Sequence, residues 1–369
     1  MKIIKVDLKK RAYNIIVGNR TLGSLGKHLK KLDIGNDAYV ISNAAIKNQY
    51  GKALNKTLKN SGFDIRFKLI PDTEKSKSIE MVSLIIQDIT RYDRKRRVFI
   101  IAFGGGVIGD LAGFIASIYK RGISYLQVPT TLLAQVDSGI GGKTAVDLIQ
   151  GKNLVGTFYQ PRLVFSDVSM LKTLDSRQIK TGLAEVIKYG VIKDPRLFIY
   201  LEKKYRDILN LKPKALEFIV RSCSEIKAKI VQADEKEEKG TRTVLNFGHT
   251  LGHAIEAAAD YKGYNHGEAV ALGMLLACDI SMKLKLITNA TARRIESLIK
   301  IVGLPTQIRK ISPDEIIEAH YRDKKFIGAK NKFVLIKGIG KTKIIENIPL
   351  GMIKKVLKKR VLDRLLIAG

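Results

Sequence analysis

The apolar segment RVFIIAF at positions 97–103 runs directly into a group of four glycines, at positions 104, 105, 106 and 109. The segment LAGFIASIY follows from position 111. A short apolar run that ends at glycines predicts a buried strand, and the following segment predicts a helix. A tight turn between them needs fewer glycines than this. We therefore interpret the turn as a place where the backbone approaches a phosphorylated ligand, which the N-terminus of the helix would bind.

Glycines 104, 106 and 109 satisfy the pattern G-x-G-x-x-G in the strand–turn–helix context that dinucleotide-binding proteins require. Two features differ from an ordinary Rossmann unit. The motif does not follow the first strand of the chain, and no acidic residue ends the next predicted strand. A dinucleotide bound here would need another contact to its ribose.

Strand and helix patterns alternate on both sides of this turn. That order predicts a Rossmann-like α/β domain with a parallel sheet over residues 1–175. Beyond the N-terminal segment, we predict strands at 38–42, 63–70, 97–103, 123–128 and 163–166, and helices at 47–61 and 78–92.

From Arg177 onward the patterns become helical, which predicts an all-α second domain over residues 176–369. The length of 369 residues also favours two domains. We predict helices at 214–233, 243–259, 267–286, 290–301 and 352–367, and one short hairpin at 332–345.

Three of the five histidines, His249, His253 and His266, lie close together in the sequence. His249 and His253 are four residues apart and Asn246 precedes them by three, so on one helix these three side chains would share a face. Apolar residues fill the neighbouring positions. A polar stripe is hard to explain by packing there, because an unpaired buried polar group costs about 1–3 kcal/mol. The stripe predicts a site for a divalent metal or an anion, with His249 and His253 as the obvious pair of ligands.

A further metal ligand is predicted in the segment GLAEVIKYG at positions 182–190. Glu185 and Lys188 lie near one face of this predicted helix, and their neighbours are apolar. A plain surface ion pair explains such surroundings poorly. Glu185 is therefore the candidate carboxylate ligand.

A second glycine-rich segment begins at Asp137 and reads DSGIGGKT. It resembles the end of a P-loop, but Asp137 stands where the first glycine belongs, which disfavours a nucleoside triphosphatase. Lys143, Lys152 and Asn153 suit the binding of a phosphorylated ligand instead.

The chain carries 66 Lys and Arg residues against 35 Asp and Glu, a net charge of +31. The basic residues are scattered and do not alternate with aromatic residues, so specific nucleic-acid binding is disfavoured. We interpret the excess as solvated surface around a site for an anionic substrate.

Several features favour a cytoplasmic protein without a membrane segment. No run of about 18 apolar residues exists, and the N-terminal sequence mixes charge with alternating Val and Ile. Cys223 and Cys278 lie in apolar, helix-like surroundings, which is typical of unreactive thiols in a reducing compartment.

The sequence resembles the 3-dehydroquinate synthase family of sugar-phosphate cyclases. The resemblance rests on eight segments that occur in the family's order between about positions 70 and 275. They are PDTEKSKS, GGGVIGDLAGF, YKRGI, VPTTLLAQVDSGIGGKTAV, GKNLVGTFYQP, GLAEVIKYG, LNFGHTLGHAIE and NHGEAVALGM. The resemblance implies an NAD-binding α/β domain, a helical domain with a zinc or cobalt ion, and a homodimer.

The resemblance also implies individual roles. The metal ligands become Glu185, His249 and His266, and His253 moves to the substrate phosphate. The substrate contacts would be Asp137, Asn153, Lys188, Lys227, Arg242, Asn246 and His253, with Lys143 nearby and Arg121 reaching the site of a neighbouring subunit. The NAD contacts would be Asp72, Glu74, Lys77, Gly105, Gly106, Val107, Ile108, Gly109, Asp110, Thr130, Thr131, Lys143, Lys152, Met170, Leu171, Lys172 and Thr173.

The implied reaction converts 3-deoxy-D-arabino-heptulosonate 7-phosphate into 3-dehydroquinate and phosphate. NAD would take a hydride from a ring carbon, phosphate would leave, and the hydride would return before an aldol step closes the carbocycle. Cyclases of other sugar phosphates, polyol or glycerol-phosphate dehydrogenases, and a basic nucleic-acid-binding protein are the alternatives. Lys227 and Arg242 favour a substrate that carries a carboxylate.

Three positions depart from the family pattern or stay open. Asn43 lies in the loop SNAA, where the family often has an Asp and an Asn for the ribose. Either Glu237 or Glu238 could take the acidic position near the metal. Either Lys332 or Lys337 could be the lysine expected at the C-terminal hairpin.

Overall fold

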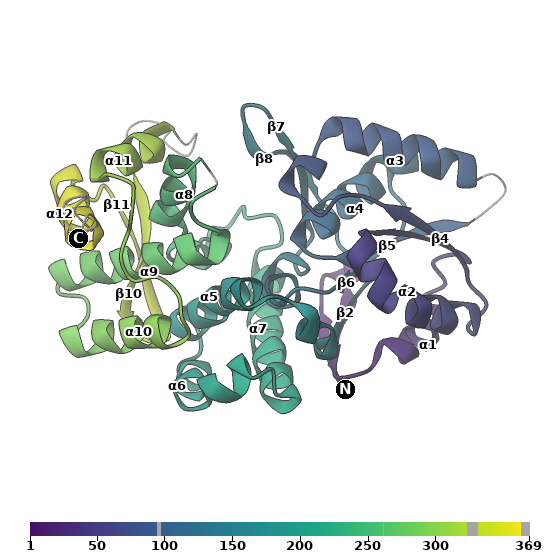
Figure 1. The fold of residues 1–369 in the computed structure, drawn as a ribbon, viewed down its shortest axis with the longest axis horizontal. Coiled ribbons are helices and arrows are strands. Elements are labelled where there is room, and N and C mark those ends of the chain that lie inside the picture. The colour runs from purple at the N-terminus through teal and green to yellow at the C-terminus, as the bar shows by residue number, and fades with distance from the viewer. Residues whose placement is uncertain (94–96, 261, 323–330, 363–369) are drawn as a thin grey trace. The chain divides into compact units, whose positions relative to one another are not determined.

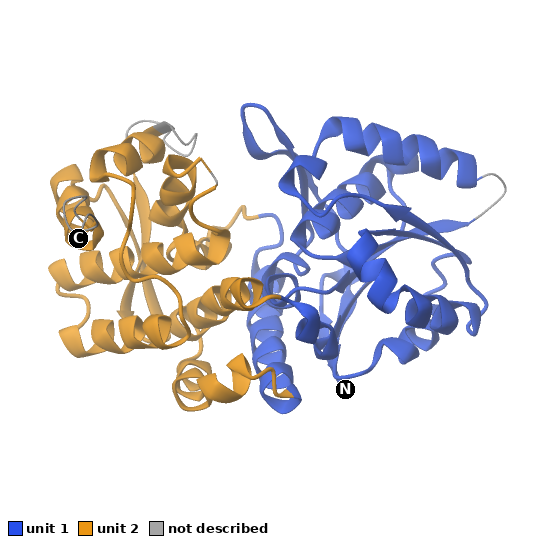
Figure 2. Ribbon diagram, in the orientation of Figure 1, with its two compact units in different colours: residues 1–174, 213–236 blue, residues 175–212, 237–369 orange. Residues whose placement is uncertain are grey.

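The computed structural model describes residues 1–93, 97–260, 262–322 and 331–362. The chain forms two compact units (Figure 2). Unit 1 comprises Met1–Leu174 and Pro213–Lys236, and unit 2 comprises Asp175–Lys212 and Glu237–Gly369.

One helix does not follow the predicted division of the chain into two domains between residues 175 and 176. Helix α7 (Pro213–Ala233) belongs to unit 1, although it lies far beyond the predicted boundary. It packs against β1 (Lys2–Val6) and β2 (Tyr13–Gly18), and its apolar side chains are buried. The helix thus covers the antiparallel edge of the sheet. The predicted boundary was placed where the sequence becomes helical, and that criterion cannot show which unit a helix packs against.

The sheet of unit 1 has seven strands in the order β1-β2-β9-β6-β5-β3-β4. Figure 1 labels β2, β4, β5 and β6 of this sheet. β1 is antiparallel to β2, and every other neighbouring pair is parallel, as predicted for a Rossmann-like domain. The remaining strands are β3 (Asp37–Ser42), β4 (Asp64–Leu69), β5 (Val98–Gly104), β6 (Tyr125–Pro129) and β9 (Leu163–Asp167).

Helices cover both faces of this sheet. Tyr39 and Ile41 of β3 pack with α3 (Ile79–Tyr92) and α4 (Gly106–Ile118). Ala38 and Val40 point to the other face and pack with α1 (Leu25–Lys30) and α2 (Ala44–Lys59). Both faces are buried, which explains why these strands are continuously apolar.

A topological switch point lies between β3 and β5. The chain leaves β3 toward α2 on one face of the sheet and leaves β5 toward α4 on the other face. The carboxyl ends of two such neighbouring strands diverge, and ligands of open α/β sheets bind in the crevice at that point. Asn43 follows β3 there, and Gly105 follows β5.

A hairpin of unit 1 was not predicted. β7 (Lys143–Leu148) and β8 (Gly151–Phe158) pair as antiparallel strands outside the main sheet. Thr144 and Val146 are buried while their neighbours are more exposed, so the strand alternates as a half-covered hairpin does. Lys143, Lys152 and Asn153 all lie on this hairpin.

Unit 2 is mainly helical, and most predicted helices are confirmed. Its helices are α5 (Ser176–Ile192), α6 (Pro195–Leu209), α8 (His249–Ala258), α9 (His266–Lys283), α10 (Asn289–Ile301), α11 (Pro313–Arg322) and α12 (Leu350–Arg360). The predicted hairpin is present as β10 (Lys332–Gly338) and β11 (Lys341–Glu346), whereas α6 and α11 were not predicted. The last positions of the predicted helix 352–367 lie outside the described residues. Within the described ranges, no helix is both long and apolar enough to cross a membrane.

The predicted helix 243–259 was wrong as a single element. A 3₁₀ turn, η7 (Thr241–Asn246), ends before Gly248, which has φ 81°, and α8 begins at His249. A Cβ on Gly248 would lie 2.6 Å from Cγ of Met274 and 2.8 Å from the carbonyl oxygen of Val270. The close approach of α9 therefore requires glycine and a left-handed turn at this point. Asn246 consequently does not share a helix with His249 and His253.

Candidate functional site

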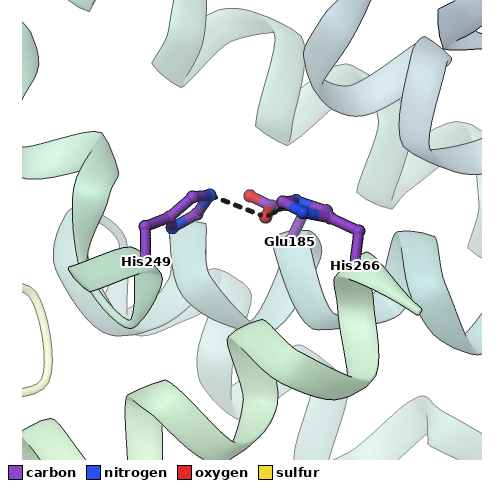
Figure 3. Close-up of side chains that lie close together, drawn as sticks. All are labelled: Glu185, His249 and His266. Atoms are coloured by element: carbon purple, nitrogen blue, oxygen red, sulfur yellow. Dashed lines mark hydrogen bonds and ion pairs between the residues drawn. The ribbon is translucent and has the colours of Figure 1, made fainter. Parts of the chain in front are cut away.

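Helices α5, α8 and α9 of unit 2 bring Glu185, His249 and His266 together (Figure 3). Oε1 of Glu185 lies 3.4 Å from Nε2 of His249 and 3.2 Å from Nε2 of His266. One possible ligand atom from each residue lies within 4.8 Å of the others. Two imidazole nitrogens and one carboxylate oxygen form the donor set of catalytic zinc sites, which keep a further position open.

His249 is the first residue of α8, and its orientation follows from the turn at Gly248. Its Nδ1 lies 3.2 Å from the carbonyl oxygen of Phe247, two residues earlier. If Nδ1 donates its proton to that oxygen, Nε2 keeps a lone pair that points toward Glu185.

His266 is the first residue of α9, and a capping box fixes the start of this helix. The Asn265 side chain accepts from the amide of Glu268, and the Glu268 side chain accepts from the amide of Asn265. A bidentate ion pair between Arg177 and Glu268 fixes the same turn from α5. The other ring nitrogen of His266, Nδ1, lies 3.6 Å from Oε2 of Glu256 on α8.

Lys188 lies beside this cluster and is fully buried. It forms a buried ion pair with Glu185 one helical turn away, which their spacing on one helix face allows. Burial and the charge of Lys188 lower the pKa of His249 well below its usual value. Burial would also lower the pKa of His266, but Glu185 and Glu256 outweigh it and raise this pKa to about 10. The two rings therefore lie in different electrostatic surroundings.

His253 lies one turn after His249 but does not join the group around Glu185. It forms a second group with Glu256 and His266, and its ring centroid lies 6.3 Å from that of His266. The obvious pair of His249 and His253 is therefore not the pair that faces Glu185. The triad implied by the family resemblance is the one that the structure brings together.

Arg242 of η7 is buried, and its Nε lies 3.5 Å from Oε1 of Glu237. The two acids left open by the sequence are both exposed, and Glu237 is the one that pairs with this arginine. Asn246 at the end of the same turn is exposed.

The two candidate lysines of the C-terminal hairpin are both exposed. The carbonyl oxygen of Lys332 accepts a hydrogen bond from Thr250 of α8, so the start of β10 lies beside the helix that carries His249. Lys337 lies near the far end of β10. Along β10, Lys332 therefore lies nearer than Lys337 to the helix that carries His249.

A buried lysine, Lys77, organises the glycine turn of unit 1. Its Nζ lies 2.9 Å from Oδ2 of Asp110, 2.5 Å from Oδ1 of Asn153 and 3.5 Å from Oε1 of Glu74. Burial would lower the pKa of Lys77, but the carboxylates, led by Asp110, raise it. Lys77 therefore stays charged and joins the N-terminal part of α4, through Asp110, to the β7–β8 hairpin, through Asn153.

Asp147 of β7 completes this arrangement. Its carboxylate accepts the amide of Asn153 at 2.7 Å, and its own amide donates to the carbonyl oxygen of Lys77 at 2.7 Å. Asn153 has φ 55°, a left-handed conformation that asparagine tolerates better than most residues.

The glycine turn itself lies at the switch point. α4 begins at Gly106, inside the motif, and its N-cap Gly105 provides no side chain to cap the first amides. A Cβ on Gly109 would lie 2.8 Å from the side chain of Gln127, so this glycine permits close packing of α4 on β6. The turn thus combines a helix N-terminus with backbone that a ligand can approach.

The other predicted NAD contacts lie around the carboxyl end of the same sheet. Asn43 caps α2 and donates to Asp72 at 2.8 Å, which gives it a structural role. Thr130 and Thr131 follow β6, and Thr173 contacts the hydroxyl of Tyr50 at 3.2 Å. Met170 and Leu171 are buried, so their side chains serve the core, whereas Lys143, Lys152 and Lys172 are exposed. Arg121, predicted to reach a neighbouring subunit and not NAD, is exposed as well.

Sequence reasoning missed two acidic residues of these clusters, Glu256 and Asp147. Glu256 follows His249 by seven residues and His253 by three, so the helical spacing was a usable signal. Asp147 had no such signal, because its role depends on the unpredicted hairpin.

The fold and the histidine cluster first define a class, the sugar-phosphate cyclases. The chain superposes with a TM-score of 0.88 and 27% identity on a crystal structure of 2-deoxy-scyllo-inosose synthase complexed with carbaglucose-6-phosphate, NAD⁺ and Co²⁺. That match covers 97% of this chain and 100% of the other. A structure of 2-epi-5-epi-valiolone synthase from Streptomyces hygroscopicus subsp. jinggangensis with NAD⁺ and Zn²⁺ bound gives a TM-score of 0.86 at 27% identity, covering 96% and 98% of the two chains.

Sequence similarity then gives the family. Models described as the N-terminal and C-terminal parts of 3-dehydroquinate synthase match residues 67–181 and 182–326. The chain is 46% identical to the 3-dehydroquinate synthase of Thermoanaerobacter pseudethanolicus over 93% of its length and 96% of the relative. It is 43% identical to that of Desulforamulus reducens over 97% and 100%. The chain belongs to the 3-dehydroquinate synthase family.

Proposed function

We propose that the protein is a 3-dehydroquinate synthase, a phosphorus–oxygen lyase of aromatic amino acid biosynthesis. It converts 3-deoxy-D-arabino-heptulosonate 7-phosphate into 3-dehydroquinate and phosphate with NAD and a divalent metal, zinc or cobalt. The observation that carries this proposal is the convergence of Nε2 of His249 and of His266 on Oε1 of Glu185 in a member of this family.

The donor set fits a divalent metal. Both Nε2 atoms face Glu185, and each Nδ1 lies against an oxygen atom, of Phe247 or of Glu256. A metal that binds Nε2 of His266 would displace the second ring proton that its raised pKa implies. Two neutral imidazoles and one carboxylate then leave part of a zinc coordination shell open. A metal held there would lower the pKa of substrate hydroxyls that occupy the open positions.

The switch point of unit 1 fits NAD. The N-terminus of α4 would face the pyrophosphate, and Lys77 would hold the glycine turn and the β7–β8 hairpin in place through Asp110 and Asn153. NAD⁺ bound there would accept one hydride from the substrate and return it within the same turnover. The proposed NAD contacts are those that the family resemblance implies.

Basic and polar residues of this chain would bind the two anionic ends of the substrate. Lys227 is oriented by Asp137, Arg242 by Glu237 and Lys188 by Glu185. Lysine and arginine held in this way lose little freedom on binding and form charge-assisted hydrogen bonds with carboxylate and phosphate. His253 and Asn246 would contribute to the phosphate site, and Lys143, Lys152 and Asn153 would supply further contacts from the hairpin.

We further propose a cytoplasmic homodimer in which Arg121 reaches the site of the partner. Arg121 is exposed, and it adopts a left-handed conformation with φ 62° just after α4. The two buried free thiols, Cys223 and Cys278, agree with a reducing compartment.

Metal-dependent dehydrogenases are the main rival with a related fold. A glycerol dehydrogenase from Schizosaccharomyces pombe superposes with a TM-score of 0.68 at 17% identity over 94% of this chain and 88% of the other. At this identity the likeness shows the fold alone.

The proposal is tested by phosphate release from purified protein that has been supplied with NAD and Zn²⁺. The substrates are the heptulosonate 7-phosphate and a panel of sugar phosphates without a carboxylate. We expect release from the heptulosonate alone, because Lys227 and Arg242 match its carboxylate. Release from a carboxylate-free sugar phosphate, with none from the heptulosonate, would instead favour another cyclase.

A further inference from the structure

Both ring nitrogens of His266 face a carboxylate. Nε2 lies 3.2 Å from Oε1 of Glu185, and Nδ1 lies 3.6 Å from Oε2 of Glu256. His249 is arranged in the same way, with Nε2 near Glu185 and Nδ1 3.2 Å from the carbonyl oxygen of Phe247. Each ring therefore has one nitrogen toward the centre of the cluster and the other against an oxygen atom outside it.

We propose that Glu256 is a positioning residue for His266. When a metal binds Nε2, the ring would keep its proton on Nδ1, which faces Glu256 at the ion-pair distance of 3.6 Å. This contact would fix the tautomer and turn the Nε2 lone pair toward the metal. The proposal rests on the proposed function only in requiring that a metal binds at Glu185, His249 and His266. Histidines that bind metals almost always donate their second ring N–H to a carboxylate, a carbonyl oxygen or water, and such partners make the ring a stronger ligand.

The position of Glu256 supports this role. The residue is only 8% exposed, and the helical spacing places it on the face of α8 that carries His249 and His253. A buried carboxylate is costly unless it is paired. Because Glu256 faces Nδ1 of His266 and is not one of the three proposed ligands, its removal would free the orientation of this ring and leave all three ligands in place.

The same residues allow a competing interpretation. One possible ligand atom each from His253, Glu256 and His266 also lies within 4.8 Å of the others, so these three could hold a second cation. His266 would then bind one metal through each ring nitrogen, which requires the loss of both ring protons. A neutral imidazole keeps one N–H, so the positioning role requires the ring to lose one proton fewer than the two-metal arrangement does.

The test uses the full-length chain, freed of metal and titrated with Zn²⁺ alone against a competing chelator. The variants are Glu256→Ala, which removes the acceptor, and Glu256→Gln, which keeps an acceptor oxygen without the charge. Asp314→Asn is the matched control, since it removes one negative charge from an exposed pair with Lys354 in the same unit. Denaturant unfolding confirms that each variant is folded.

We expect zinc affinity to fall about 10- to 100-fold in Glu256→Ala, less in Glu256→Gln and not at all in Asp314→Asn. One zinc ion should bind per chain in every variant. The Co²⁺-loaded Glu256→Ala protein should show an altered visible spectrum, and excess metal should restore most of its kcat.

Two results would overturn the positioning role. The first is an unchanged zinc affinity and Co²⁺ spectrum in both Glu256 variants. The second is two zinc ions in the wild type and one in Glu256→Ala, which would make Glu256 a ligand of a second site. A wild type that binds no zinc would instead contradict the proposed function itself, so the two failures are distinguishable.

Discussion

Nζ of Lys227 lies 2.6 Å from Oδ1 of Asp137 and 2.7 Å from the main-chain carbonyl oxygen of the same residue. Lys227 is on α7, the helix that joins unit 1 late in the sequence, and Asp137 lies on the turn after β6. The pair therefore links a distant helix to the second glycine-rich segment. It also orients two groups that we propose to contact the substrate.

Substitution of this pair should show strong coupling. Lys227→Met removes the buried cation that faces Asp137, and we expect the free energy of unfolding to fall by about 1–3 kcal/mol. Asp137→Asn should cost a similar amount, and the double variant less than the sum, with a coupling of about 0.5–3 kcal/mol. Urea unfolding of all four proteins measures this. Additive losses would contradict a direct interaction within unit 1.

Measuring the zinc content of alanine variants should distinguish the roles of the three clustered histidines. His249→Ala and His266→Ala should lose stoichiometric zinc and nearly all turnover, because each removes one of the three proposed ligands. His253→Ala should keep its zinc and bind the phosphate group poorly, which raises KM for the substrate. Zinc lost from the His253 variant but retained in the His266 variant would reverse the assignment.

The turn before α8 should be sensitive to a single methyl group. Gly248→Ala places a Cβ 2.6 Å from Cγ of Met274 at φ 81°, so we expect a loss of about 1–3 kcal/mol in stability. Zinc affinity should fall as well, because His249 follows directly. Gly351→Ala is the matched control. That glycine lies in α12 with no neighbour within 4 Å of an added Cβ, and alanine there should be neutral or stabilising. Equal effects at both positions would show that the turn has no special requirement.

Much of the fold could be predicted because its local signals agree with its packing. The buried strands β3 and β5 are continuously apolar, and the glycines after β5 mark the start of α4. The break at Gly248 could not be predicted, since it depends on the approach of Val270 and Met274 from another helix. The placement of α7 in unit 1 likewise depends on long-range packing.

The candidate site was predictable to a similar extent. The sequence predicted Glu185 as a ligand because it is an acid among apolar residues, whereas a role for Lys188 in the site came only from the family resemblance. Spacing alone pointed to His253 as the partner of His249, whereas the ring that faces Glu185 with it belongs to His266, on a different helix. Contacts between helices are not encoded in a helical period, so only the family resemblance implied the triad that the structure brings together.

We expect the net charge of +31 to increase kcat/KM by attracting the anionic substrate. If the basic surface steers a doubly anionic substrate, kcat/KM falls with added salt while kcat hardly changes, because screening shortens the field to about 8–10 Å at 0.1–0.15 M ionic strength. Replacing Lys355 and Lys358 of α12 with Gln should leave the salt slope nearly unchanged, whereas Arg242→Gln should lower affinity directly. Tight binding of a DNA duplex at physiological salt, with kcat/KM independent of salt, would contradict steering and reopen a nucleic-acid role.

The central claim is that NAD is required but not consumed. The most direct measurement follows phosphate release and NADH absorbance together while the NAD-free protein turns over the heptulosonate 7-phosphate with Zn²⁺. We predict no release until NAD is added, then many phosphates per NAD without accumulation of NADH. Growth of NADH in proportion to product would contradict the account and make the protein a dehydrogenase.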